Sequence, residues 1–295
     1  MLTKIRRIRE RLGQISELLK RVDDLQKAVG RLELQFQSLP HQRISLREHE
    51  FKVYSQWGED GIIQFLINHV KIDHNVFVEF GVEDYQESNT RFLLQNNYWS
   101  GLVIDGSPEN ISKIQADPIY FKHNLTAISA FVDKDNINNL LVKHGISGDI
   151  GLLSIDIDGN DYWVWQAINV IRPAIVIVEY NHRFGPDRSV TIPYDKYFVR
   201  SKAHHSMIYY GASLKALCNL GSKKGYTFVG TTRSGGNAFF VRKDLKDNKV
   251  EDLSVTEGFT AGLFRESRDV KGNLIFLSHE DEIKILSSLP IVNVD

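Results

Sequence analysis

The chain has 295 residues, of which 42% are hydrophobic and 25% are charged, so it can bury one sizeable core. Its 36 Lys and Arg residues nearly balance its 37 Asp and Glu residues, which argues against a nucleic-acid partner. The single cysteine, Cys218, excludes an intramolecular disulfide, no apolar run approaches the roughly 20 residues that cross a bilayer, and the charged start lacks an apolar signal core. We therefore expect one catalytic domain in a reducing, cytoplasmic setting.

The first 40 residues have the pattern of a long amphipathic helix. Apolar residues recur at steps of three or four: Ile5, Ile8, Leu12, Ile15, Leu19, Val22, Leu25, Val29, Leu32, Phe36 and Leu39. Two three-residue steps meet at Val22, a stammer that would overwind a coiled coil locally, and Pro40 ends the helix. The length of the stripe favours self-association through a coiled coil over packing on the chain's own domain. A basic cluster also fits peripheral contact with anionic lipid, although a solvated face is commoner: Lys4, Arg6, Arg7, Arg9 and Arg11.

Residues 41–295 alternate β-branched runs with helical patterns, which predicts a second, α/β domain. The expected strands are 76–80, 101–105, 119–121, 151–156 and 174–179, and the expected helices are 60–69, 90–96, 107–115, 136–144 and 162–167. Such alternation is typical of a Rossmann-like open sheet, mostly parallel and covered by helices on both faces.

The second half of this domain has a different pattern. An irregular stretch, 181–210, is long enough to be a functional lid or insertion. A helix at 213–224 and two strands at 226–229 and 237–241 then predict a C-terminal antiparallel hairpin. The tail, 244–295, gives no functional signal, and we expect it to pack back onto the domain.

Acidic residues close four of the predicted strands: Glu79, Asp105, Asp156 and Glu179. In an open parallel sheet, ligands bind outside the carboxyl ends of the strands, so four acids in register at that edge predict a site. Asp105 is well placed to accept hydrogen bonds from the hydroxyls of a ribose. Each acid taken singly is explained equally well by a structural role and by a functional one. Asp161, for example, has the position of a helix cap.

Four motifs together resemble the FkbM-type methyltransferases: Tyr54-Ser55-Gln56-Trp57-Gly58-Glu59-Asp60, Phe77-Val78-Glu79-Phe80-Gly81-Val82-Glu83-Asp84, Gly101-Leu102-Val103-Ile104-Asp105-Gly106-Ser107 and Ser154-Ile155-Asp156-Ile157-Asp158-Gly159. The resemblance covers about residues 51–241, and the late hairpin fits a class I fold. It implies that S-adenosylmethionine binds against a set of residues at the strand ends: Ser55, Gln56, Glu79, Gly81, Asp105, Gly106 and Asp156. One departure is that Val82 and Glu83 stand where the class usually has a further glycine, so the cofactor loop takes a different path.

A hydroxyl acceptor needs a Lewis acid or a base, because a neutral alcohol is a poor nucleophile. Oxygen ligands at neighbouring strand ends suit magnesium: Asp156, Asp158, Glu179 and Asn181. The alternative is a metal-free base, for which the candidates are Asp158, His182, His204 and His205. The resemblance implies an O-methyltransferase acting on a sugar hydroxyl of a glycan or glycosylated metabolite.

Two other classes of protein remain open. A nicotinamide-dependent oxidoreductase would share Asp105, but residues 81–86 lack the Gly-x-Gly-x-x-Gly that should follow the first strand. A catalytically silent scaffold in a polysaccharide assembly complex would keep the sheet and the coiled coil, yet it has no need of an acid at every strand end.

Overall fold

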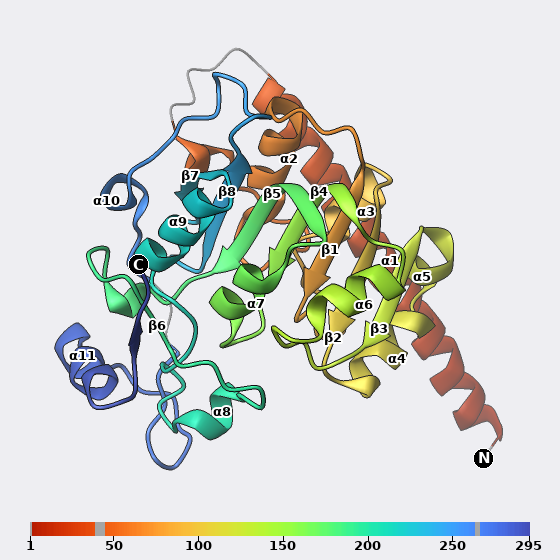
Figure 1. The fold of residues 1–295 in the computed structure, drawn as a ribbon. Helices are drawn as coiled ribbons and strands as arrows, with labels where there is room; N and C mark the ends of the chain where they lie inside the picture. Colours follow the sequence, from red (N-terminus) through yellow and green to blue (C-terminus); the bar gives the residue numbers. More distant parts are fainter. Residues whose placement is uncertain (1, 39–44, 263–265) are drawn as a thin grey trace.

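The computed structural model describes residues 2–38, 45–262 and 266–295, and in the first helix it describes the side chains of Ile15 and residues 18–36. A seven-stranded sheet in the order β3-β2-β1-β4-β5-β8-β7 forms the centre (Figure 1). Its strands are β1 (Val76–Phe80), β2 (Ser100–Asp105), β3 (Leu125–Ser129), β4 (Gly148–Ile155), β5 (Ile171–Glu179), β7 (Tyr226–Thr231) and β8 (Asn237–Arg242). Strands β1 to β5 pair in parallel, and β8 runs antiparallel to both β5 and β7. The expected mostly parallel sheet with a C-terminal antiparallel hairpin is confirmed.

Helices cover both faces of the sheet. They are α2 (Glu59–His69), α3 (Arg91–Asn96), α4 (Pro108–Ala116), α5 (Pro118–Lys122), α6 (Ile137–Lys143), α7 (Asp161–Ala167) and α9 (Leu214–Lys223). Side chains alternate between the faces along each strand. In β1, Phe77 therefore packs with α2 and α3, while Val78 and Phe80 pack with α6, α7 and α9. Two cores thus fix the strand ends relative to one another.

The strand predicted at 119–121 is wrong. These residues belong to α5, and the third strand of the sheet is β3, which follows it. Asp117 accepts a hydrogen bond from the Ile119 amide as the N-cap, and Pro118 occupies the first helical position, where its missing N–H costs nothing. The cap and the proline therefore outweigh the β-propensity of the short apolar run.

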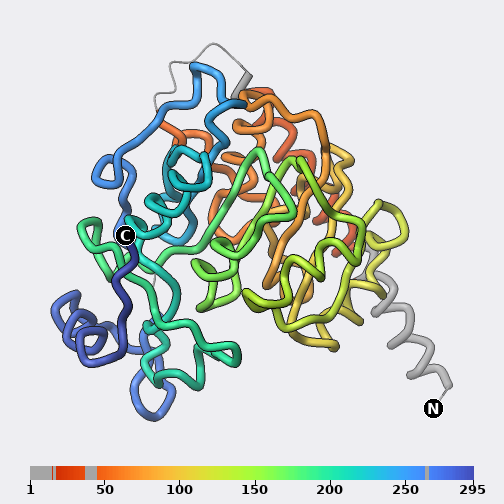
Figure 2. The backbone as a smooth tube through the Cα atoms, in the orientation of Figure 1, coloured from red at the N-terminus to blue at the C-terminus, as the bar shows by residue number. Residues whose placement is uncertain are grey.

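The segment after β5 and the C-terminal tail form a second, smaller layer. The first contains η2 (His182–Phe184), β6 (Val190–Thr191) and α8 (Arg200–Ala203), and the second contains α11 (His279–Ser287) and β9 (Val292–Asn293). The tail also contains α10 (Val255–Gly258), which packs on β7 and α9 of the main domain instead. Strands β6 and β9 pair antiparallel, and Figure 2 shows the blue tail ending beside the green insertion. A separate apolar cluster holds the layer together: Phe184, Val190, Ile192, Ile208, Tyr209 and Leu286. The insertion is therefore packed in place by the tail.

The first helix, α1 (Leu2–Ser38), docks on the domain through Gly30. A Cβ at this position would lie 2.5 Å from Val53 Cγ2, so the helix can approach only because the residue is glycine. A glycine inside a helix costs about 1 kcal/mol relative to alanine, and this contact offsets the cost. Leu39 and Pro40, and the side chains of Ile5, Ile8, Leu12 and the basic cluster from Lys4 to Arg11, lie outside the described residues. No helix of the described chain is long and apolar enough to cross a membrane.

Candidate functional site

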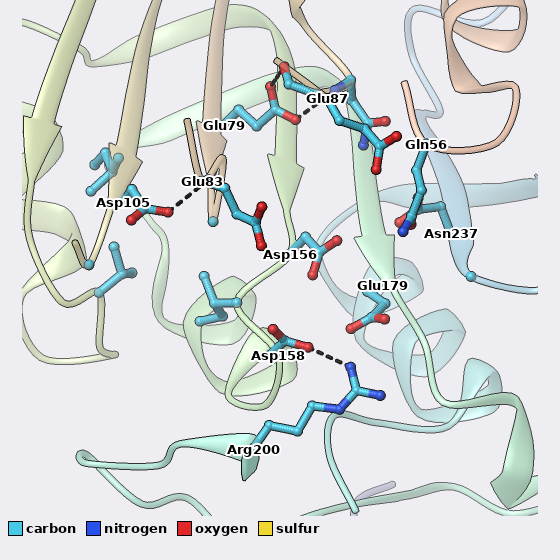
Figure 3. Close-up of a pocket in the computed structure, with 18 of the residues that line it drawn as sticks. Gln56, Glu79, Glu83, Glu87, Asp105, Asp156, Asp158, Glu179, Arg200 and Asn237 are labelled. Atoms are coloured by element: carbon cyan, nitrogen blue, oxygen red, sulfur yellow. Dashed lines mark hydrogen bonds and ion pairs between the residues drawn. The ribbon is translucent and has the colours of Figure 1, made fainter. Parts of the chain in front are cut away.

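A cavity of about 580 Å³ opens at the carboxyl ends of the parallel strands (Figure 3). This volume lies in the range that holds cofactors and small ligands. Eight acidic side chains line it: Glu79, Glu83, Glu87, Asp105, Asp156, Asp158, Glu179 and Glu266. Arg200 is the one basic side chain among the described lining residues. Carboxyl groups thus outnumber the cationic side chain in this cavity, which favours a cationic ligand over an anionic one.

The acidic ends of β1 and β4 meet at this cavity because the backbones of the two segments come very close together just beyond the paired strands. Gly81, directly after β1, has φ +72°, and a Cβ there would lie 1.6 Å from the Asp156 carbonyl oxygen. Only glycine tolerates both the conformation and the contact. Gly81 thus brings Glu79 and Asp156 to one rim, and Gly106 lies on the same rim after Asp105.

Glu79 organises the loop that leads to α3. Its carboxylate accepts hydrogen bonds from Ser88 Oγ (2.9 Å), the Asn89 amide (2.9 Å), and both the amide and the Oγ1 of Thr90 (3.1 and 2.5 Å). Burial raises the pKa of Glu79, whereas these donors lower it. Since a carboxylate has about four acceptor positions in all, Glu79 shapes the cavity wall and has little capacity left for a ligand.

Asp105 is 8% exposed and is partly free to bind a ligand. Its Oδ1 accepts hydrogen bonds from the Ser107 amide (2.8 Å) and Asn110 Nδ2 (3.1 Å), and its Oδ2 accepts one from the Glu83 amide (2.9 Å). One acceptor position of Oδ2 remains, which is enough for one hydroxyl. Glu83 has φ +47°, a strained conformation for a residue with a side chain. The departure from the usual glycine pattern therefore places a backbone amide on Asp105.

The loop before α2 is held by two buried acids. Asp60 accepts hydrogen bonds from the amides of Val53 and Tyr54 (both 2.7 Å) and from the amide and the Oγ of Ser55 (2.8 and 3.0 Å). Ser55 is thus fully buried against Asp60 and does not line the cavity, whereas Gln56 does. Glu59 accepts hydrogen bonds from the amides of Trp57 and Gly58 and from Asn237 Nδ2, which ties this loop to β8.

Replacing Asp60 with alanine should destabilise the protein, because three buried backbone amides would lose their acceptor. We expect the free energy of unfolding to fall by about 3 kcal/mol. Burial raises the pKa of Asp60 to about 6, so the cost of burying this carboxylate already cancels part of the stability that its hydrogen bonds provide. Urea unfolding measures the change. Asp187→Ala, at an exposed site, is the control, and equal stabilities of the two variants would contradict the assignment.

Asp156, Asp158 and Glu179 form a compact acidic group, with one oxygen of each within 4.8 Å of the others. Burial, and then repulsion between these carboxylates, raises the pKa of Asp156 and of Glu179 well above the ordinary range. Glu179 Oε2 is buried and has no hydrogen-bond partner among the described residues. Three convergent oxygen donors with an unsatisfied buried atom fit a divalent cation of the magnesium type.

The turn after β4 positions Asp158 for this group. Asp161 accepts hydrogen bonds from the amides of Ile157 and Gly159, both at 2.9 Å, so it holds the preceding turn and is not the helix cap that the sequence suggested, because the N-cap of α7 is Asn160. The turn gives Asp158 φ +56°, and its side chain is 59% exposed. Strain in a non-glycine residue at a cavity rim is typical of a functional position.

Arg200, from α8, lines the cavity next to Asp158. Its Nη1 donates to Asp158 Oδ1 (2.6 Å), its Nη2 to Glu266, and its Nε to the Met207 carbonyl (2.7 Å). Its guanidinium also lies 3.7 Å from the centre of the Tyr210 ring. The insertion and the tail thus each contribute a charged residue to the wall of the cavity.

Several expected site residues lie elsewhere. Asn181, expected as a fourth metal ligand, is fully buried, and its Nδ2 donates to the carbonyls of Ile208 and Tyr210. His182 is buried next to Gly262 outside the cavity, and burial lowers its pKa to about 3. The rings of His204 and His205 lie against each other in a tilted arrangement, with centroids 4.2 Å apart, and neither residue lines the cavity. None of these four side chains lines the cavity, so none is placed to act there as a ligand or a base.

Sequence reasoning missed a second set of lining residues: Trp57, Glu83, Glu87, Asn89, Phe131, Phe198, Arg200, Asn237 and Glu266. Glu83 and Glu87 follow the first acidic strand end directly, so that motif offered a signal. Arg200 and Glu266 lie in segments without a recognisable pattern, and only tertiary packing brings them to the site.

The raised pKa values of Asp156 and Glu179 predict how stability depends on pH. The folded protein holds protons that the unfolded chain releases above the ordinary pKa values of 3.8 and 4.5. This stabilisation is complete below those values and is lost as the pH rises through the folded pKa. Glu179→Gln should therefore flatten the profile and be more stable than the wild type by about 1 kcal/mol or more at about pH 8 without divalent metal. Denaturant unfolding at about pH 5 and pH 8 tests this against the exposed control Glu280→Gln. Parallel wild-type and Glu179→Gln profiles would contradict it.

Comparison with known proteins found no matching family model and no matching curated protein. Among solved structures, the chain is similar to an S-adenosylmethionine-dependent methyltransferase from Clostridium acetobutylicum (11% identity, TM-score 0.40, covering 72% of this chain and 98% of that one). It is similar to an O-methyltransferase from Bacillus cereus in complex with S-adenosylhomocysteine (12% identity, TM-score 0.40, covering 73% of this chain and 91% of that one). It also resembles an O-methyltransferase family protein from Burkholderia thailandensis (8% identity, TM-score 0.37), where the match covers 62% of this chain and 57% of that one. The strand order, with β8 antiparallel between β5 and β7, is the mostly parallel α/β sheet with a C-terminal antiparallel hairpin that the sequence predicted.

Proposed function

We propose that this chain is an S-adenosylmethionine-dependent O-methyltransferase of the FkbM-like type that acts on a sugar hydroxyl. The observation that carries the proposal is the acidic cavity at the carboxyl ends of the strands, with Asp105 on one side and the Asp156–Asp158–Glu179 group on the other. The first side suits a nucleoside and the second suits the reacting hydroxyl. The four sequence motifs that resemble the FkbM-type enzymes contribute many of the residues around this cavity.

The charge of the cavity distinguishes this function from a nicotinamide-dependent one. The donor of a methyl group is a sulfonium cation, which a wall of eight acids and one arginine attracts. A dinucleotide carries a diphosphate, which binds at a glycine-rich helix N-terminus. Here Gly81 follows the first strand, but Val82 and Glu83 come next in place of further glycines, and Glu83 lines the cavity. The excess of carboxyl groups therefore favours the methyl donor over the dinucleotide.

A silent scaffold is also disfavoured. The unpartnered oxygen of Glu179, the raised pKa of Asp156 and the strained backbone of Asp158 all cost stability. A purely structural sheet gains nothing from these features, whereas perturbed carboxylates in a cleft are a mark of a functional site.

In the proposed reaction the acceptor oxygen bonds to the methyl carbon as the carbon–sulfur bond breaks, the electron pair stays on sulfur, and the hydroxyl proton leaves to a base. Asp105 would hold the nucleoside hydroxyl, and the cavity walls would align oxygen, carbon and sulfur. With metal bound the proton would pass directly to water, and in the metal-free alternative Asp158, exposed at the rim, would take the proton and pass it to water. Asp156, Asp158 and Glu179 would hold a magnesium ion, which supplies Lewis acidity that lowers the pKa of the hydroxyl.

The rim suits an uncharged sugar. Trp57 and Phe131 are 42% and 48% exposed at the cavity, and Phe198 lies against the same space. Exposed aromatic rings bind the apolar faces of sugars, while the surrounding acids repel phosphate groups. Assays with a labelled methyl donor should therefore show turnover with neutral oligosaccharides and little with nucleotide sugars. Binding of the methyl donor without transfer to any hydroxyl acceptor would overturn the proposed acceptor class.

Metal removal gives a further expected result. Protein treated with a chelator and freed of metal should lose most of its methyl transfer, and magnesium should restore it. The double variant Asp156→Asn/Glu179→Gln should not be restored, because two of the three ligands have lost their charge. Full activity of the chelated wild type would show that Asp158 works as a base without metal.

A further inference from the structure

The described part of α1 has a continuous heptad stripe on its exposed side. Seven apolar residues follow one another at alternating steps of three and four: Ile15, Leu18, Val22, Leu25, Val29, Leu32 and Phe36. Each is between 45% and 65% exposed. Leu18 and Leu19 are both exposed, and a stripe that runs through Leu18 contains no stammer. We call these seven residues the seam.

The residue types alternate along the seam as they do in parallel two-stranded coiled coils. The first heptad position holds β-branched Ile15, Val22 and Val29, and the fourth holds Leu18, Leu25 and Leu32. β-Branched residues at the first position with leucine at the fourth favour two parallel strands over three or four. The seam spans 22 residues, or about 33 Å of helix at 1.5 Å per residue, which is three heptads.

The opposite side of the helix is already bound to the chain's own domain. Asp23 accepts a hydrogen bond from Tyr54 Oη (2.5 Å), and Arg31 Nε donates one to Asn96 Oδ1 (3.1 Å). Gly30 is buried against the domain, and Leu34 packs on its apolar surface. These residues occupy the second, third and sixth heptad positions, which lie away from the seam. The docked helix therefore presents the seam to solvent, and the domain itself does not cover it.

The residues that flank the seam indicate what covers it. Among residues 18–36 the flanking positions hold Leu19, Arg21, Gln26, Ala28, Glu33 and Gln35. One positive and one negative charge do not make the cationic border that an anionic membrane surface requires. In a parallel pair Arg21 would face Gln26 of the other copy and Ala28 would face Glu33, so no like charges oppose each other. A second copy of this chain fits both the apolar seam and its borders.

We propose that two copies of this chain associate through the seam as a parallel, in-register, two-stranded coiled coil, with the two catalytic domains on its outer sides. This goes beyond the proposed enzymatic function, which does not depend on it. Because the seam is exposed in the single chain, substitutions there test association without disturbing the core of the domain.

Light scattering of the full chain during gel filtration should give twice the chain mass of 33.8 kDa. Leu25→Glu should give the mass of one chain and raise the dimer Kd at least about 100-fold, because two glutamates would meet in one buried layer. Leu19→Glu is the matched control, since it makes the same change beside the seam and should leave the dimer intact. A monomeric wild type, or a Leu25→Glu variant that remains dimeric, would overturn the proposal.

Cysteine crosslinking tests the direction of pairing. In a Cys218→Ser background, Leu18→Cys and Leu32→Cys should each form an intermolecular disulfide on oxidation, because identical residues face each other in every layer of a parallel pair. Lys20→Cys, which points away from the seam, should remain a monomer on non-reducing gels. Failure of both seam cysteines to crosslink in a dimeric protein would overturn the parallel arrangement.

Discussion

Asp158→Asn is expected to lower kcat for methyl transfer by about 10²–10⁴-fold while leaving the affinity for S-adenosylhomocysteine unchanged. The reason is that Asp158 stands with Asp156 and Glu179 on the acceptor side of the cavity, where its carboxylate would bind metal or accept the proton of the hydroxyl. Asparagine keeps the size of the side chain but can do neither with comparable strength. Steady-state kinetics with a labelled methyl donor, together with calorimetric titration of S-adenosylhomocysteine, would measure both quantities.

Glu87→Gln is the matched control for this change. Glu87 also lines the cavity and is 54% exposed at its side chain, but it pairs with Lys52 at 3.1 Å and is not part of the acidic group. We expect its kcat to stay within a few-fold of wild type. A loss of less than 10-fold for Asp158→Asn, or equal losses for the two variants, would remove Asp158 from the reaction.

Asp105→Ala is expected to weaken binding of the methyl donor by about 10–100-fold, which is the worth of one hydrogen bond to a charged group. The KM for the donor should rise accordingly, while the KM for the acceptor should stay near its wild-type value. This asymmetry follows from the position of Asp105 at the end of β2, across the cavity from the acidic group.

Asn110→Ala separates binding from local structure. Asn110 donates a hydrogen bond to Asp105 Oδ1 (3.1 Å) but does not line the cavity. Its removal should therefore disturb the support of Asp105 while sparing the contact with the ligand, and we expect less than about a 5-fold change in affinity. If Asn110→Ala reproduced the effect of Asp105→Ala, the role of Asp105 would be structural only.

The parts of the fold that follow local rules could be predicted from the sequence. The β-branched runs of β1, β2, β4 and β5 and the hairpin of β7 and β8 are buried elements whose pattern survives in the structure. The run at 119–121 misled, because an apolar stretch of three residues cannot distinguish a strand from a helix and the decisive cap lies outside it. In α1, Leu18 and Leu19 are adjacent and both apolar, so spacing alone did not fix the register.

The candidate site could be predicted only where topology decides it. Residues at the ends of parallel strands must share one edge of the sheet, so Glu79, Asp105, Asp156 and Glu179 could be placed together before any coordinates. Their individual roles could not be predicted, because the loop hydroxyls and amides that donate to Glu79 come from residues nine to eleven positions later.

No comparable rule predicts which residues of the insertion and the tail reach the cavity. Asn181 follows β5 as an acceptor-side ligand should, yet the backbone turns and its side chain holds the insertion instead. Arg200 and Glu266 reach the cavity through the pairing of β6 with β9 and the cluster around Phe184. Contacts over such distances in sequence are set by packing, which a single sequence does not display.

Calorimetric titration of the wild-type protein with S-adenosylhomocysteine and, separately, with NAD tests the central claim most directly. The nucleoside side of the cavity, at Asp105, predicts saturable one-to-one binding of S-adenosylhomocysteine, and the acidic walls predict no detectable heat from NAD, which carries a diphosphate. Binding of NAD in preference, or the absence of any binding of S-adenosylhomocysteine by a folded protein, would contradict the assignment of this cavity to methyl transfer.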